Sequence, residues 1–180
     1  SADTMTAIVQ DLLLLAKSDE GRLELRKTCV PLVTIVDEAV LLARRPDHAS
    51  IERDIPAELD VFADPPLLNR VLVNLLSNAV RHTPAEGTVR IVASEAGCAT
   101  SIVVSDSGEG IPPEHLARIF DRFHRVDTAR DRESGGTGLG LAIAKSIVEA
   151  HHGRISLASE LGKGTTVTIS LPSPPLEERI

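Results

Sequence analysis

Gly135-Gly136-Thr137-Gly138-Leu139-Gly140 runs directly into Leu141-Ala142-Ile143-Ala144-Lys145-Ser146-Ile147-Val148-Glu149, and this stretch decides how the rest of the chain is interpreted. The apolar residues recur at helical spacing, so a helix is expected straight after the glycines. Glycines let backbone N–H groups approach an anion closely, and a helix N-terminus adds partial positive charge. The stretch predicts a phosphate-binding turn, with a plain turn before a helix as the alternative. It lacks the Gly-Lys-Ser/Thr of a Walker loop and the preceding strand of a dinucleotide fingerprint.

The composition is that of a globular protein with an aliphatic core. The 180 residues are 42% hydrophobic and 25% charged, enough for one well-buried domain plus an extra element. Aromatic residues make up 2%, with no Trp or Tyr, which disfavours base stacking on single-stranded nucleic acid. A net charge of −7 also disfavours a polyanionic partner. We therefore expect no nucleic-acid partner.

Two further features bear on the compartment. Cys29 and Cys98 have no metal-type spacing and lie among apolar residues, which predicts reduced, buried thiols. No apolar run reaches the roughly 18 residues that span a bilayer, and we expect no signal peptide. The chain is expected to be a cytoplasmic domain.

Hydrophobic periodicity predicts alternating helices and strands. Helices are expected over residues 1–19, 31–45, 67–83, 113–119 and 139–151. Strands are expected over residues 23–26, 51–55, 59–62, 88–93, 100–105, 154–158 and 165–171. The first helix carries a heptad-like apolar seam that it cannot bury by itself, so it either packs on its own domain or forms half of a helical hairpin.

The helix over 67–83 carries polar side chains suited to a charged ligand. Asn74 and Asn78 are four residues apart, and Arg81 and His82 continue the same side one turn later. Amide oxygens suit Mg²⁺, and an arginine suits phosphate. The alternative is a solvated polar face. Asp64, followed by two prolines, is the expected N-cap.

A carboxylate follows the strand over 100–105. Asp106 precedes Gly108 and Gly110, so it could accept a hydrogen bond from an exocyclic amine while a flat ring lies against bare backbone. The alternative is an Asp that only forms a turn. Residues 126–134 are polar and poorly periodic, which suggests a mobile lid, and His151-His152 suggests a helix end rather than a metal site.

Five motifs occur in an order that resembles the ATP-binding catalytic domain of sensor histidine kinases. They are similar to the N, G1, F and G2 boxes and the final glycine motif, and they stand at residues 74–82, 106–112, 120–127, 136–141 and 162–165. The resemblance covers residues from about 22 to 171. It implies an α/β (α+β) two-layer sandwich of the Bergerat ATP-binding type, a mixed sheet covered by helices on one face, with a leading amphipathic helix.

The same resemblance implies the site residues. Asp106 would bind the adenine amino group, and Asn78 with Asn74 would hold Mg²⁺. Arg81 and Arg125 would contact phosphate and, with Asn78, serve catalysis; Arg122 is a weaker candidate for a phosphate contact. The other residues implied for the ATP site are His82, Gly108, Gly110, Ile111, Phe123, Gly136, Thr137, Gly138, Leu139, Gly140 and Thr165.

The resemblance also implies domains and partners. Residues 1–20 resemble the end of the second helix of a dimerisation and phosphoacceptor hairpin, residues 21–172 the catalytic domain, and residues 173–180 form a loose tail. No His-Glu-Leu-Arg-Thr-Pro motif is present, so this chain is expected to bind ATP and Mg²⁺ without phosphorylating itself. The parent is expected to be a homodimer anchored in a bacterial inner membrane that passes phosphate to a response regulator receiver domain, and this chain a monomer.

Three rival interpretations remain open at the level of sequence. One is an ATP-hydrolysing relative of the gyrase, Hsp90 or MutL type, although Arg70 stands where such relatives have an acidic residue near the first Asn, so hydrolysis is expected to be slow or negligible. Another is a nucleotide-sensing module without transfer chemistry, because Arg81 and His82 stand where the family often has Lys and Tyr. The third is a structural domain that binds no nucleotide.

Overall fold

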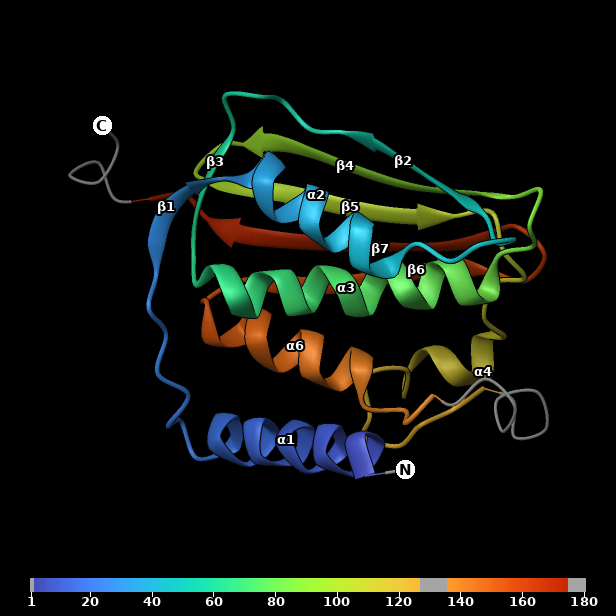
Figure 1. Cartoon of the computed structure of the whole chain (residues 1–180), viewed down its shortest axis with the longest axis horizontal. Coiled ribbons are helices and arrows are strands. Elements are labelled where there is room, and N and C mark those ends of the chain that lie inside the picture. The colour runs from blue at the N-terminus through green and yellow to red at the C-terminus, as the bar shows by residue number, and fades with distance from the viewer. Residues whose placement is uncertain (1, 127–135, 175–180) are drawn as a thin grey trace.

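The computed structural model describes residues 2–126 and 136–174. Figure 1 shows a sheet with helices packed along one side of it. The helices are α1 (Ala2–Asp19), α2 (Leu32–Ala43), α3 (Pro65–His82), α4 (Pro113–Leu116) and α6 (Gly140–Ala150). The strands are β1 (Thr28–Pro31), β2 (Ser50–Asp54), β3 (Asp60–Ala63), β4 (Thr88–Ala96), β5 (Ala99–Asp106), β6 (Arg154–Glu160) and β7 (Gly164–Pro172).

The main sheet is mixed. Its five strands lie in the order β2-β4-β5-β7-β6; β2 runs parallel to β4, and the other neighbours are antiparallel. A separate two-stranded sheet pairs β1 with β3. The predicted hairpins β4–β5 and β6–β7 are both present. The expected two-layer α+β sandwich with a mixed sheet is confirmed.

The aliphatic core lies between the sheet and helices α2, α3 and α6. In the described residues, its largest fully buried side chains are all Leu or Ile, as expected for a chain with so few aromatics; they come from these elements and, with Leu15, from α1. Helix α3 begins as its sequence predicts: Asp64 Oδ1 accepts a hydrogen bond from Leu67 N, and Pro65 occupies the first turn. This cap fixes where the polar side of α3 starts.

A buried histidine ties the end of α6 to the start of α3. His151 Nε2 accepts a hydrogen bond from Asp64 N at 3.0 Å, and Nδ1 lies 2.8 Å from Ile147 O. These partners require the neutral tautomer with the proton on Nδ1. Burial lowers the pKa of His151, which agrees with a neutral ring. His151 therefore joins the end of α6 to the start of α3, and both of its ring nitrogens take part in hydrogen bonds with the protein backbone.

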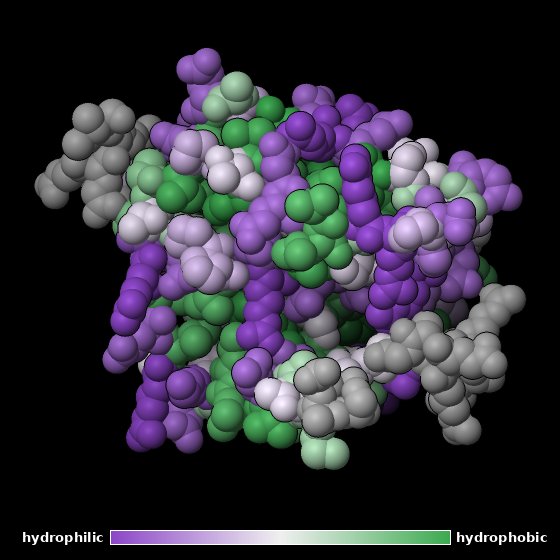
Figure 2. Space-filling view, in the orientation of Figure 1, coloured by the Kyte–Doolittle hydropathy of each residue, from purple (hydrophilic) through white to green (hydrophobic). Residues whose placement is uncertain are grey.

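Helix α1 packs on α6 at the lower edge of the molecule (Figure 1). Two ion pairs attach it further: Asp11 with Arg70 of α3, and Asp19 with Arg122, at 2.6 Å. Part of its apolar surface stays exposed, visible as green atoms along the lower edge in Figure 2. The exposed apolar side chains of α1 are Met5, Val9, Leu12 and Leu13. No helix in the described residues is both long and apolar enough to cross a membrane.

The structure corrects three local expectations. Residues 23–26 are extended without a strand partner, and the strand lies at Thr28–Pro31 because those residues pair with Asp60–Ala63. Helix α4 ends at Leu116, and turns continue to Phe123. The two cysteine side chains are exposed rather than buried, because one lies on the small β1–β3 sheet and the other in the β4–β5 turn.

Candidate functional site

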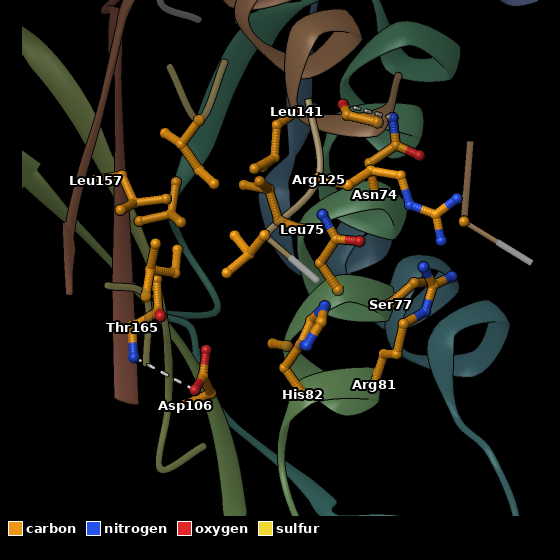
Figure 3. Close-up of a pocket in the computed structure, with 18 of the residues that line it drawn as sticks. Asn74, Leu75, Ser77, Arg81, His82, Asp106, Arg125, Leu141, Leu157 and Thr165 are labelled. Atoms are coloured by element: carbon orange, nitrogen blue, oxygen red, sulfur yellow. Dashed lines mark hydrogen bonds between the residues drawn. The ribbon is translucent and has the colours of Figure 1, made fainter. Parts of the chain in front are cut away.

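A cavity of about 410 Å³ opens between the C-terminal half of α3, the ends of β5 and β7, and the glycine turn before α6. Figure 3 shows side chains from these separate elements pointing into it. Most residues that the sequence assigned to an ATP site line this cavity. They are Asn74, Asn78, Arg81, His82, Asp106, Gly110, Ile111, Arg125, Gly136, Thr137, Gly138, Gly140 and Thr165.

One wall of the cavity is an apolar strip on the sheet. Val104 on β5 pairs with Val167 on β7, which pairs in turn with Leu157 on β6, so three aliphatic side chains lie in one row across the strands. Asp106 and Thr165, the next pair on the same face, come directly beside this row. An apolar strip that ends in a carboxylate suits a flat heterocycle carrying one amino group.

Asp106 is held by backbone donors. Its Oδ1 accepts hydrogen bonds from Gly108 N at 2.8 Å and Thr165 N at 3.3 Å, and the second of these is drawn in Figure 3. Within residues 2–126 and 136–174, its Oδ2 accepts no hydrogen bond from the protein, so a ligand donor can use it. Desolvation by burial raises the pKa of Asp106, while the two backbone hydrogen bonds oppose that rise. The carboxylate is fixed in place yet costly to keep charged without a ligand.

The glycines near Asp106 are required by backbone packing. A Cβ on Gly108 would collide with the carbonyl oxygen of His82, at the end of α3. A Cβ on Gly110, whose φ is +71°, would collide with the carbonyl of Glu160. The first approach brings the loop after Asp106 against the end of α3, and the second brings it against the end of β6. Glycine is therefore needed at both positions because the neighbouring backbone is close. The cause expected from the sequence was a different one, the stacking of a flat ring against bare backbone.

Polar groups gather at the other end of the cavity. Asn74 lines the cavity, and its Nδ2 donates a hydrogen bond to Gly140 O at 3.2 Å, which leaves Oδ1 as the amide atom not used in this bond. The guanidinium of Arg81 lies against Gly136, where any Cβ would collide with it. In Figure 3 the guanidinium groups of Arg81 and Arg125 lie on the same side of the cavity, away from Asp106. Two cations, amide oxygens and a glycine turn suit a chain of phosphates.

A side-chain contact crosses the mouth of the cavity near Asp106. His82 Nδ1 lies 3.0 Å from Glu109 Oε1, and both residues line the cavity. The backbone adds a second connection, because Glu109 N donates to His82 O at 3.3 Å. Two contacts therefore join the end of α3 to the loop after β5, close to Asp106.

Three residues implied for the ATP site do not line the cavity, and neither does the weaker phosphate candidate Arg122, which pairs with Asp19 of α1. Gly108 packs against α3 as described above. Leu139, the N-cap residue of α6, is fully buried and belongs to the hydrophobic core. Phe123 is 59% exposed with a φ of +61°, and its backbone N–H donates to Gly138 O at 2.9 Å. Phe123 thus supports the glycine turn through its backbone. The expected lid and Gly135 fall largely on residues 127–135, outside the described residues.

Sequence reasoning missed several lining residues. The aliphatic row of Val104, Leu157 and Val167 alternates as any buried strand does, and only the strand register shows that it meets Asp106. Asp11 also lines the cavity from α1, about 60 residues before the motifs. Asp11 is placed there by its ion pair with Arg70 of α3, and no local sequence pattern indicates that pairing.

Fold and cavity together define a nucleotide-binding domain, in which an apolar slot ending in a carboxylate meets a cationic glycine turn. Residues 63–175 match the family described as "Histidine kinase-, DNA gyrase B-, and HSP90-like ATPase", so the chain belongs to this family. Within it, the similar proteins are two-component sensor kinases, and the chain is an ATP-binding catalytic domain of the histidine-kinase type.

The curated relatives are much longer than this chain. It is 39% identical to the sensor histidine kinase CusS of Escherichia coli (strain K12), over 94% of this chain and 35% of that protein. It is 38% identical to the sensor protein SrrB of Staphylococcus aureus (strain NCTC 8325 / PS 47), over 94% of this chain and 30% of that protein. The chain therefore spans about a third of the length of these relatives.

Solved structures confirm the expected Bergerat fold. The mycobacterial sensor histidine kinase MprB superimposes with a TM-score of 0.72 at 30% identity, covering 82% of this chain and 99% of that one. Full-length ShkA in complex with AMPPNP superimposes with a TM-score of 0.79 at 27% identity, covering 95% of this chain and 36% of that one.

Proposed function

We propose that this chain binds Mg-ATP in the cavity and delivers the γ-phosphoryl group to a histidine on a helix outside the chain, for relay to an aspartate of a response regulator. The observation that carries the proposal is the polarity of the cavity. The carboxylate of Asp106, with one oxygen available, closes an apolar strip at one end, and Arg81, Arg125 and the glycine turn lie at the other. That order matches adenine, ribose and triphosphate.

Asp106 accepts the adenine amino group through Oδ2, and Val104, Leu157 and Val167 contact the ring. The backbone of Gly136–Gly140 surrounds the phosphates. Arg81, which already lies against Gly136, neutralises charge on them. Arg125 approaches from the segment that leads to residue 127 and contacts the γ-phosphate. These groups supply position and charge stabilisation, which is what phosphoryl transfer requires of a protein.

Mg²⁺ fits the amides of α3. Asn74 and Asn78 lie one helical turn apart on the cavity side, and the bond from Asn74 Nδ2 to Gly140 O leaves Oδ1 as a possible ligand. Mg²⁺ takes few protein ligands and keeps waters and phosphate oxygens for the rest. Bound there, the ion would neutralise the charge that develops on the phosphates.

Helix α1 supports a further part of the proposal. Its exposed apolar side chains are those of a helix that packs against other helices, as in a dimerisation hairpin. We propose that residues 1–20 end the second helix of such a hairpin, that the parent is a membrane-anchored homodimer, and that this chain alone is a monomer without self-phosphorylation. Sedimentation at micromolar concentration tests the monomer, and a longer chain that includes the upstream helix tests phosphohistidine formation.

Calorimetric titration of the chain with ATP, with and without Mg²⁺, tests nucleotide binding directly. Micromolar affinity, about −8 kcal/mol, is expected. GTP should bind more weakly, because its ring presents a carbonyl to the Asp106 carboxylate where adenine presents an amine. Equal affinity for ATP and GTP would contradict the assigned role of Asp106, and no binding of either would contradict the site.

A further inference from the structure

Two histidine rings meet at the rim of the cavity, outside the roles proposed above. His115 lies in α4, and His124 lies in the segment that leads to Arg125. His115 Nδ1 is 3.2 Å from His124 Nε2, the ring centroids are 5.3 Å apart, and the ring planes are inclined by 47°. Both side chains are half-buried, and His124 lines the cavity.

The geometry of this pair suits two ligands of one metal ion. Imidazole nitrogens bind Zn²⁺ at about 2.0–2.1 Å in a tetrahedral arrangement, which places two such nitrogens about 3.3 Å apart. The observed separation of 3.2 Å is close to that value. Two rings radiating from one tetrahedral ion would have centroids about 5.2 Å apart, and the observed value is 5.3 Å. Both distances are thus compatible with one ion bound by the two rings.

The surroundings leave the remaining coordination positions to water. Asp121, the carboxylate next to His124 in the turn, pairs with Arg118 at 3.2 Å. In the part of the chain that the structure describes, no group of three or more His, Cys, Asp or Glu side chains converges on one point. The site is therefore a two-histidine site that is open to solvent, and its affinity comes from chelation by two rings held on separate segments.

We propose that His115 and His124 form a binding site for a divalent transition metal ion of the kind that imidazole favours, such as Zn²⁺. The ion joins α4 to the segment that carries Arg125, and so fixes that segment at the rim of the cavity. Hard cations such as Mg²⁺ prefer oxygen ligands and do not bind there. The proposal does not depend on nucleotide binding, and its test is made without nucleotide.

The test is a calorimetric titration with Zn²⁺ of the tag-free chain in which the two exposed cysteines are replaced (Cys29→Ser, Cys98→Ser), because thiolates also bind zinc. One equivalent of Zn²⁺ should bind in the micromolar range, and Mg²⁺ should give no heat at this site. His115→Ala or His124→Ala should weaken zinc binding by at least about 10-fold, because each removes one of two linked ligands. His48→Ala, at an exposed histidine far along the chain, is the matched control and should change nothing.

Because an alanine variant could fail to fold, a second measurement uses the chain in which His115 and His124 are both retained. In long-range ¹H–¹⁵N spectra, Zn²⁺ should shift the ring nitrogens of His115 and His124 together, and those of His48 not at all. The proposal is wrong if Zn²⁺ does not bind, if both alanine variants bind as tightly as the parent, or if the ring signals of other histidines move instead. In each of those cases the 3.2 Å contact is a hydrogen bond between two imidazoles and nothing more.

Discussion

Replacing Asp106 by Asn separates the contribution of this residue to binding from its contribution to stability. The substitution keeps Oδ1, so the hydrogen bonds from Gly108 N and Thr165 N persist. It replaces Oδ2, the atom left for a ligand, by an NH₂ group. That group meets the amino group of adenine donor to donor.

The size of the effect on binding follows from the bond that is lost. A hydrogen bond to a charged group contributes about 1.5–3 kcal/mol. At 1.4 kcal/mol per decade, Asp106→Asn should therefore weaken ATP binding by about 10- to 150-fold. The NH₂ group can donate to the carbonyl of guanine, so the preference for ATP over GTP should narrow or reverse.

The effect on the ligand-free protein should have the opposite sign. Burial raises the pKa of Asp106, so the folded chain binds this proton more readily than the unfolded chain does. Stability therefore decreases as the pH rises through the range between the unfolded and the folded pKa, and at neutral pH the charged carboxylate opposes folding. Asp106→Asn removes this opposition, so the Tm without nucleotide should rise or stay unchanged.

The assay combines calorimetry with ATP and GTP and a thermal melt without nucleotide. Asp54→Asn, at a well-exposed carboxylate on the edge strand β2, is the matched control and should leave nucleotide binding unchanged. Unaltered ATP affinity in Asp106→Asn would refute the adenine contact. Weaker ATP binding accompanied by a large fall in Tm would mean that the substitution acts by unfolding the domain.

Three other outcomes are expected. The pKa of His151 is lowered, so the folded chain binds this proton less readily than the unfolded chain, and stability should be full above about pH 6.5 and fall below it. In His151→Gln, the loss of stability with falling pH should be smaller. Thermal melts at a series of pH values check this, with His152→Gln as the control. Gly164→Ala should unfold or strongly destabilise the domain, because φ is +107° and a Cβ would collide with the Asp106 carbonyl, whereas Gly162→Ala, in open space at φ +78°, should lower the Tm only slightly. Asn78→Ala should abolish the gain in ATP affinity that Mg²⁺ provides without weakening Mg²⁺-free binding, and calorimetry that shows an unchanged Mg²⁺ effect would remove this residue from the metal site.

The sequence predicted the elements that carry strong local signals. Asp64 and its prolines start α3 where expected, and the glycine turn leads into α6. The strand at Thr28–Pro31 was misplaced because its partner, β3, is about 30 residues away and no local pattern encodes that pairing. Apolar and polar residues alternate more clearly at residues 23–26 than at Thr28–Pro31. The pairing of Thr28–Pro31 with β3 nevertheless decides where the strand forms.

The candidate site divides in the same way. Its polar residues stand in recognisable motifs, so Asn74, Arg81 and Asp106 were predicted together. The reasons for several of its glycines were not, because whether a glycine faces a ligand or a neighbouring backbone depends on how α3 packs on the sheet. Leu139 illustrates the limit: it belongs to the glycine motif by sequence and to the hydrophobic core by position.

The bond between His151 and Asp64 has a consequence for motion. It joins the start of α3 to the end of α6, at the ends of the two helices that lie away from the cavity. The other ends, at His82 and Gly140, border the cavity. Because one pair of helix ends is joined, we expect a ligand to rearrange mainly the opposite pair and the glycine turn beside it. Amide hydrogen exchange should therefore be unchanged by nucleotide at Leu67 and Leu68, and should slow from Gly136 to Gly140.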